Sequence, residues 1–246
     1  MRARLPHENI VYLADQAHVP YGDRSEDELV FLLAQNVAFL EAAGVDGIVM
    51  GCNSSCAVAS RRGWPETRVP ILDLIEAAAA DVATKTNTGR IGVIATTATT
   101  RTGAYGIAIR RRIPGAAVYE VAAPALVPLV EAGHIAGEAA DRAVAEACAT
   151  LPVSLDVVVL ACTHYPLLDP SFAKALGPAV LRLDPALVQA DRAAAFALCS
   201  SAESGRTDYV TTGPVEPYRS AIEALLGPLG EGDSVAHAAL GLAKSV

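Results

Sequence analysis

The sequence predicts an α/β fold with two pseudo-symmetric lobes, each built from a mostly parallel sheet flanked by helices. One observation is that strand patterns alternate with helical patterns along most of the chain. Another is an internal repeat, in which the stretch Val45–Ser54 returns about 110 positions later as Leu155–His164. Each copy is a short apolar run that ends in a small residue, a cysteine and a polar residue. This pattern is typical of a buried parallel strand.

The first half of the chain contains three expected strands, each followed by a helix. Ser25 and Glu28 form a capping box that starts the first helix, and Gly44 stops it. A second helix begins within 54–60 and breaks at 61–65, and Asp73 leads into a third, alanine-rich helix that ends near Gly89. The strands are expected at 9–14, before Cys52, and at 69–72.

The second half repeats this alternation. A strand at 91–95 ends in a threonine-rich segment, 96–100, that reads as a loop. Further strands are expected at 117–121, before Cys162, at 180–183 and at 209–212. Helices are expected up to 110–112, at 124–131, 136–150, 170–176, 186–199 and 216–226.

The repeat places the lobe boundaries near Gly89 and residue 187. Residues 1–88 are expected to form the first lobe and 89–186 the second. Ile10–Tyr12 matches Ala117–Tyr119, but the strand at 90–96 has no counterpart after Met1. Either the first lobe lacks one strand, or the natural protein starts upstream by roughly one strand–helix unit.

Composition limits the function classes. A net charge of −8 and a pI near 5.1 argue against nucleic acid or an anionic membrane as partner. The five cysteines are an odd number in a long chain, which favours a reducing, cytoplasmic setting over a disulfide framework. No apolar run reaches membrane-spanning length, and the start lacks the apolar core of a signal peptide.

The paired cysteines are the main candidates for catalytic residues in the sequence. In open α/β sheets, ligands bind beyond the carboxyl ends of the strands, so Cys52 and Cys162 are expected to face a cleft between the lobes. A thiol at a helix start has its thiolate stabilised by backbone N–H groups. Two thiols on opposite faces of a carbon can remove one proton and return another, which inverts a stereocentre without a metal or organic cofactor. His164 and Glu131 are candidate proton carriers for Cys162.

Each residue also has a structural interpretation. A single buried cysteine is a common core residue, His164 could be a hydrogen-bonded core histidine, and Glu131 could be a solvated helix end. Cys52 and Cys56 lack a second pair that would complete a zinc site. Cys148 and Cys199 are expected to pack within helices. The repeat favours catalysis for the matched pair, because it keeps the cysteine while its polar neighbours vary.

At these residues the sequence resembles the glutamate racemases of the aspartate/glutamate racemase superfamily. The matching segments cover nearly the whole chain in order, and Cys162–Pro166 together with Pro20–Gly22 is a specific combination. The matching segments are 5–10, 19–22, 52–54, 92–96, 127–133, 161–167 and 209–213.

The resemblance implies a cofactor-independent enzyme that interconverts L- and D-glutamate and supplies D-glutamate for peptidoglycan, and it suggests a homodimer. It also implies that the last segment, 187–246, returns to complete the first lobe. It assigns the paired acid/base thiols to Cys52 and Cys162, with His164 and Glu131 assisting. The substrate contacts that it implies are Tyr21, Gly22, Asn53, Ser54, Thr96, Thr99, Thr163 and His164. The alternatives are a racemase for aspartate or another acidic amino acid, and an inactive relative that only binds a ligand.

The sequence departs from the family pattern at its start. Family members open with a strand ending in Asp-Ser-Gly, whose Asp assists the first thiol, and this chain has no such segment. The gap coincides with the strand that the internal repeat lacks, which predicts a start codon assigned too far downstream. Ser54 and Cys56 stand where the family more often has Thr and Ser, and these changes are tolerable.

Overall fold

The structure is a computed structural model that describes residues 1–196 and 204–240. Its strands and helices alternate as the sequence predicts, and every strand pair in the described residues is parallel. The elements of the first part are β1 (Ile10–Ala14), the 3₁₀ helix η1 (Gln16–His18), α1 (Glu26–Ala42), β2 (Ile48–Val49), α2 (Asn53–Arg62), β3 (Ile71–Leu72) and α3 (Leu74–Lys85).

The predicted starts of α1 and α3 and the end of α1 are confirmed by their caps, whereas α2 starts at Asn53, one residue before the predicted range. The Ser25 hydroxyl accepts a hydrogen bond from the Glu28 amide, and the Glu28 side chain accepts one from the Ser25 amide, so the capping box is complete. α1 ends just before Gly44, whose φ of 75° lies in the left-handed region. The Asp73 side chain caps α3 by accepting from the amides of Ile75 and Glu76.

The second part follows the same order with more elements. They are β4 (Arg90–Ala95), α4 (Thr97–Thr102), α5 (Ala104–Arg112), β5 (Ala117–Ala122), α6 (Leu126–Glu131), α7 (Glu138–Cys148), β6 (Val157–Ala161), the 3₁₀ helix η2 (Tyr165–Leu168), α8 (Asp169–Leu176), β7 (Leu181–Leu183), α9 (Pro185–Phe196), β8 (Thr207–Thr211), α10 (Val215–Leu226) and β9 (Ser234–His237).

Three expectations need correction or a limit. The threonine-rich segment is not a loop but the helix α4, because Thr96 caps it by accepting from the Thr99 amide and later threonine hydroxyls bond back to carbonyls one turn earlier. The strand β9 was not predicted. The end of the helix expected at 186–199, which includes Cys199, lies outside the described residues.

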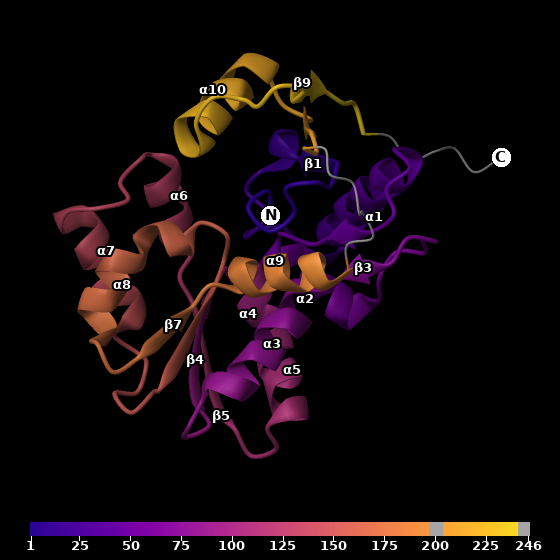
Figure 1. Cartoon of the computed structure of the whole chain (residues 1–246). Coiled ribbons are helices and arrows are strands. Elements are labelled where there is room, and N and C mark those ends of the chain that lie inside the picture. The colour runs from indigo at the N-terminus through magenta and orange to yellow at the C-terminus, as the bar shows by residue number, and fades with distance from the viewer. Residues whose placement is uncertain (197–203, 241–246) are drawn as a thin grey trace.

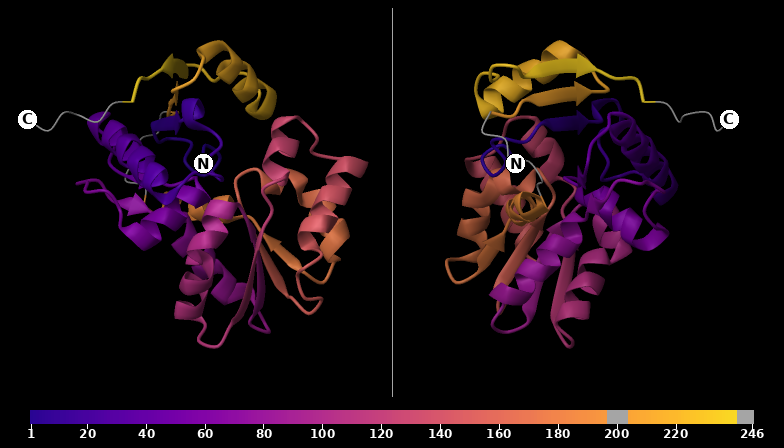
Figure 2. Two further views of the ribbon diagram at one scale, coloured as in Figure 1. Left: turned by 180° about the vertical axis from the view of Figure 1, so that it is seen from behind. Right: turned by 45° about the vertical axis from the view of Figure 1, so that its right-hand side comes forward.

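The strands form three sheets in the described residues. The largest has the order β5-β4-β6-β7, and β8 lies between β1 and β9 in another, while β2 pairs with β3. The C-terminal strands therefore lie beside the N-terminal one, as the yellow and indigo ribbons of Figure 2 show. No helix of the described chain is long and apolar enough to cross a membrane.

The two repeated parts of the chain differ in how their strands pair. In the large sheet β4 pairs with both β5 and β6. The matching strands of the first part, β1 and β2, belong to separate sheets, and no described strand pairs with both. β4, which has a neighbour on both sides, has five of its six residues buried, whereas β1 and its counterpart β5 have none.

The main apolar core joins the two parts. Buried residues of α1, α2 and α3 share one cluster with those of β4, α5 and β6, and a second cluster lies among β6, α6, α7 and α8. α3 packs against both α5 and α9. The ends of β2 and β6, where the two repeated cysteines lie, are thereby fixed to one common core.

Candidate active site

The first repeated cysteine lies at the start of a helix. β2 ends at Val49, and Cys52 is the N-cap of α2, with φ −105° and ψ 117°. Its side chain makes no capping hydrogen bond, and the residue is partly exposed. The thiol therefore stands beside the free N–H groups of the first helical turn, which stabilise a negative charge.

The second cysteine follows β6 directly and is more deeply placed. Cys162 is 6% exposed, and burial raises the pKa of its thiol to about 12, although the backbone amides of His164 and Tyr165 act in the opposite direction. The charge of Cys52 contributes to the raised pKa of Cys162, so the two thiols lie close enough to interact. At neutral pH Cys162 is a thiol that needs a partner to exchange its proton.

His164 connects Cys162 to a carboxylate. Its Nδ1 lies 3.7 Å from the Cys162 Sγ, and its Nε2 lies 2.6 Å from Oε1 of Glu131. Glu131 is the last residue of α6, so this helix end brings the carboxylate to the strand end. Thr163 is the outer neighbour, with its hydroxyl 3.4 Å from the same Nδ1. The four residues that the sequence nominated around the second thiol therefore form one chain of contacts.

The turn that carries this chain is anchored by Tyr165. Its ring is fully buried, and its hydroxyl donates to the carbonyl oxygens of Ala95 and Ala123 at 3.1 and 2.8 Å. These carbonyls lie at the ends of β4 and β5. The segment after β6 is thus fixed to the carboxyl edge of its own sheet, which holds Cys162 and His164 in place.

Three hydroxyl candidates meet where the two parts of the chain join. Ser54 from α2 lies 3.0 Å from the Thr96 hydroxyl and 3.4 Å from that of Thr99, and the two threonine hydroxyls are 3.1 Å apart. All three side chains are buried. Gly22 lies against them, because a Cβ on it would stand 3.0 Å from the Cβ of Thr96. A larger residue at Gly22 would require Thr96 to shift by a few tenths of an ångström.

Tyr21 is held by residues that the sequence reasoning missed. Its hydroxyl donates to Oδ2 of Asp15 at 2.5 Å and accepts from the Asn36 amide at 3.1 Å. Asp15 also accepts from Thr212 at 2.7 Å, and its other close contact is the His18 ring at 2.8 Å. Burial alone would raise the pKa of Asp15, but these hydrogen bonds lower it. Asp15 follows β1 directly, and the strand-end rule could have nominated it.

Asn53 is bound by a second residue that was missed. The Tyr105 hydroxyl donates to its Oδ1 at 2.5 Å, and both side chains are buried. Tyr105 lies in α5, so this hydrogen bond joins the two parts of the chain. No motif in the sequence marks it, because its role depends on packing between segments 52 positions apart.

Two further cysteines of the described residues agree with a packing role. Cys56 is fully buried in α2, and burial raises the pKa of its thiol well above the usual value. Cys148 is half-buried in α7, and burial raises its pKa to about 11. Neither takes part in the described hydrogen bonds that join Cys162, His164 and Glu131.

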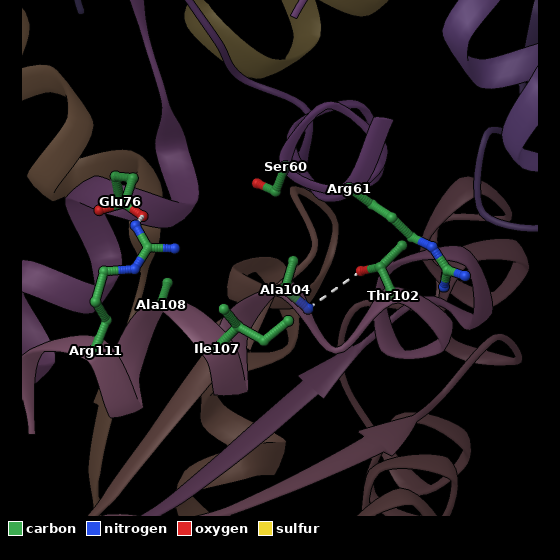
Figure 3. Close-up of a pocket in the computed structure, with 8 residues that line it drawn as sticks. All are labelled: Ser60, Arg61, Glu76, Thr102, Ala104, Ile107, Ala108 and Arg111. Carbon is green, nitrogen blue, oxygen red and sulfur yellow. Dashed lines mark hydrogen bonds and ion pairs between the residues drawn. The ribbon is translucent and has the colours of Figure 1, made fainter. Parts of the chain in front are cut away.

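A separate hollow of about 280 Å³ lies among α2, α3, α4 and α5 (Figure 3). Its charged side chains are paired: Arg111 contacts Glu76, which also lines the hollow, at 3.1 Å, and Arg61 contacts Glu26 at 3.5 Å. None of the nominated site residues lines it. The chemistry of the chain therefore centres on the strand ends and not on this hollow.

The fold and the repeated cysteines define a class, that of two-lobed parallel α/β proteins with a thiol at the end of a strand in each half. A profile of the family described as Asp/Glu/Hydantoin racemase matches residues 1–193. The chain belongs to this family.

Individual relatives agree with that assignment. The glutamate racemase of Desulforudis audaxviator is 43% identical over 183 residues, which are 74% of this chain and 67% of the relative. The crystal structure of a glutamate racemase isoform from Bacillus anthracis superposes with a TM-score of 0.87 at 26% identity, covering 97% of this chain and 91% of the other. The glutamate racemase of Francisella tularensis in complex with D-glutamate gives 0.85 at 26% identity, with 97% and 90% covered.

Proposed function

We propose that the chain is a glutamate racemase that interconverts L- and D-glutamate with two thiols and no organic cofactor. The observation that carries this is the chain of contacts from Cys162 through His164 to Glu131, and it is supported by a second thiol at the start of α2 whose charge acts on Cys162. A buried thiol with a raised pKa needs such a proton path to serve as an acid and a base. The names of the relatives supply the substrate.

The proposed step moves one proton at each face of the substrate. The thiolate of one cysteine takes the proton from Cα, and the electron pair left on carbon is delocalised into the adjacent carboxylate. The thiol of the other cysteine then donates its proton to the opposite face of Cα. The enantiomer is formed, and the two cysteines have exchanged protonation states. His164 lies close enough to Cys162 to take up or return its proton between turnovers, and Glu131 stabilises the imidazolium.

The substrate carboxylates would lie near the start of α2. The free N–H groups of this turn favour an anion, and Asn53, Ser54 and Thr163 add polar groups beside the two thiols. Tyr21, Gly22, Thr96 and Thr99 are the further substrate contacts of the proposal, and this is supported by the hydrogen bonds that join Thr96 and Thr99 to Ser54.

The wider assignments follow from the same proposal. We divide the chain into a first lobe, 1–88 with 187–246, and a second lobe, 89–186, with the site between them; this is supported by the pairing of β8 with β1 and by the β5-β4-β6-β7 sheet, which lies wholly within 90–183. A cytoplasmic enzyme that supplies D-glutamate for peptidoglycan and acts as a homodimer fits this function.

The test is proton exchange at Cα of L-glutamate in deuterated water, followed by NMR. Loss of the Cα–H signal together with formation of D-glutamate is expected. L-Aspartate, tested in parallel, should exchange far more slowly. Equal or faster exchange of aspartate would identify a racemase of another acidic amino acid, and a folded chain that exchanges neither would be a binding protein.

A further inference from the structure

Asn53 occupies a critical position beside the first thiol. It is the first residue of α2, directly after Cys52, and it is 4% exposed. Its Oδ1 is engaged by the Tyr105 hydroxyl, whereas its Nδ2 makes no hydrogen bond with any other described residue. The side chain therefore has a satisfied acceptor and an unused donor. A donor is the group that a carboxylate needs.

Tyr105 is well placed to fix this orientation. It follows Gly103, whose φ of 63° turns the chain from α4 into α5, and its side chain is fully buried. Burial raises its pKa well above the usual value, so the hydroxyl keeps its proton and donates it. Cys56, Asp73, Cys162 and Asp184 act on it in the same direction, which places the hydroxyl among groups from both parts of the chain.

We propose that Tyr105 is a positioning residue, which holds the Asn53 amide so that Nδ2 donates to a carboxylate of the bound substrate. This inference rests on the proposed function. Without the tyrosine hydroxyl, the amide could turn over and present Oδ1, which repels a carboxylate. Because Tyr105 belongs to α5 and Asn53 to α2, the same hydrogen bond also fixes the distance between the two parts of the site.

The experiment combines Y105F with N53A in a double-mutant cycle. Y105F removes only the hydroxyl, and we expect KM for both enantiomers of glutamate to rise about tenfold while kcat changes less than about threefold. In the N53A background, Y105F should change KM no further, because the group through which it acts is gone. Y218F is the matched control: Tyr218 is also buried, but its hydroxyl has no partner in the described structure.

The outcomes are distinct. A KM effect of Y105F that persists at full size in N53A would overturn the inference, as would a loss of thermal stability with unchanged KM. If the wild type does not racemise glutamate, the proposed function fails, and the cycle is then measured as calorimetric binding of glutamate to the same four proteins. In that case the inference is supported if Y105F binds glutamate more weakly than the wild type and the same substitution has no further effect on binding in the N53A background. Equal binding to wild type and Y105F contradicts it.

Discussion

The Nε2 atom of His164 lies 2.6 Å from Oε1 of Glu131, while the opposite ring nitrogen faces the Cys162 sulfur at 3.7 Å. The histidine thus stands between a thiol that keeps its proton and a carboxylate that favours an imidazolium. The Glu131 side chain is 64% exposed, so solvent screens the attraction between its charge and the His164 ring. The outer end of the proton path, at Glu131, is therefore open to water, which can supply or take up a proton between turnovers.

Replacing Glu131 with Gln should lower kcat about tenfold, because the amide still meets His164 but no longer stabilises its charged form. The measurement is steady-state racemisation in both directions. E138Q is the control, since Glu138 is an exposed glutamate on the neighbouring α7. Unchanged kcat in E131Q would remove Glu131 from the proton path.

The two thiols should be separable by substitution. C52A and C162A are each expected to abolish racemisation, because one face of Cα then has no acid or base. Each variant should still exchange Cα–H of one enantiomer with solvent, and the two variants should prefer opposite enantiomers. C148A, which removes a half-buried thiol of α7, should behave as the wild type. Racemisation by either C52A or C162A would refute the two-thiol mechanism.

The pH dependence of the C52A variant should report on Cys162. Its thiolate is the reacting form, and burial, the main cause of its raised pKa, holds that pKa above neutral in this variant even though the contribution of the Cys52 charge is lost. The exchange rate should therefore rise about tenfold per pH unit from about pH 6 to pH 8, as the thiolate fraction grows. The NMR exchange assay gives this profile directly. A plateau within that range would mean that the thiol ionises much more readily than its burial implies.

Asp15 should contribute to stability through its hydrogen bonds. Its side chain is 5% exposed, and D15N should lower the free energy of unfolding by about 1–3 kcal/mol, because the neutral amide is a weaker acceptor for Tyr21 and Thr212. The folded pKa of Asp15 is lowered, so its contribution is complete above the unfolded value and is lost as pH falls through the folded value. Urea unfolding at neutral and acidic pH measures this difference, which should shrink in acid. D191N is the control, because Asp191 is an exposed partner of Arg4; an equal loss in D191N would contradict a specific role for Asp15.

Local patterns predicted most of the fold. The capping box at Ser25, the N-cap at Asp73 and the stop at Gly44 depend on groups within one helical turn, so the sequence contains all the information they need. The wrong prediction of a loop at Thr96–Thr100 also concerns contacts within one helical turn. Threonine is common both in loops and at helix N-caps, and here the Thr96 hydroxyl accepts from the Thr99 amide and so starts a helix.

The site also has features that the sequence predicts and features that only the packing of the chain decides. The repeat by itself determined the two cysteines and the strand ends that carry them, because a buried parallel strand leaves a direct apolar pattern. Only the tertiary structure decided that Glu131 meets His164, that Tyr105 holds Asn53 and that Ser54 joins Thr96. These pairs are 33, 52 and 42 positions apart, and their contacts arise from the packing of helix ends against strand ends. A sequence records which side chains are available, whereas the packed core determines which of them come within hydrogen-bond distance.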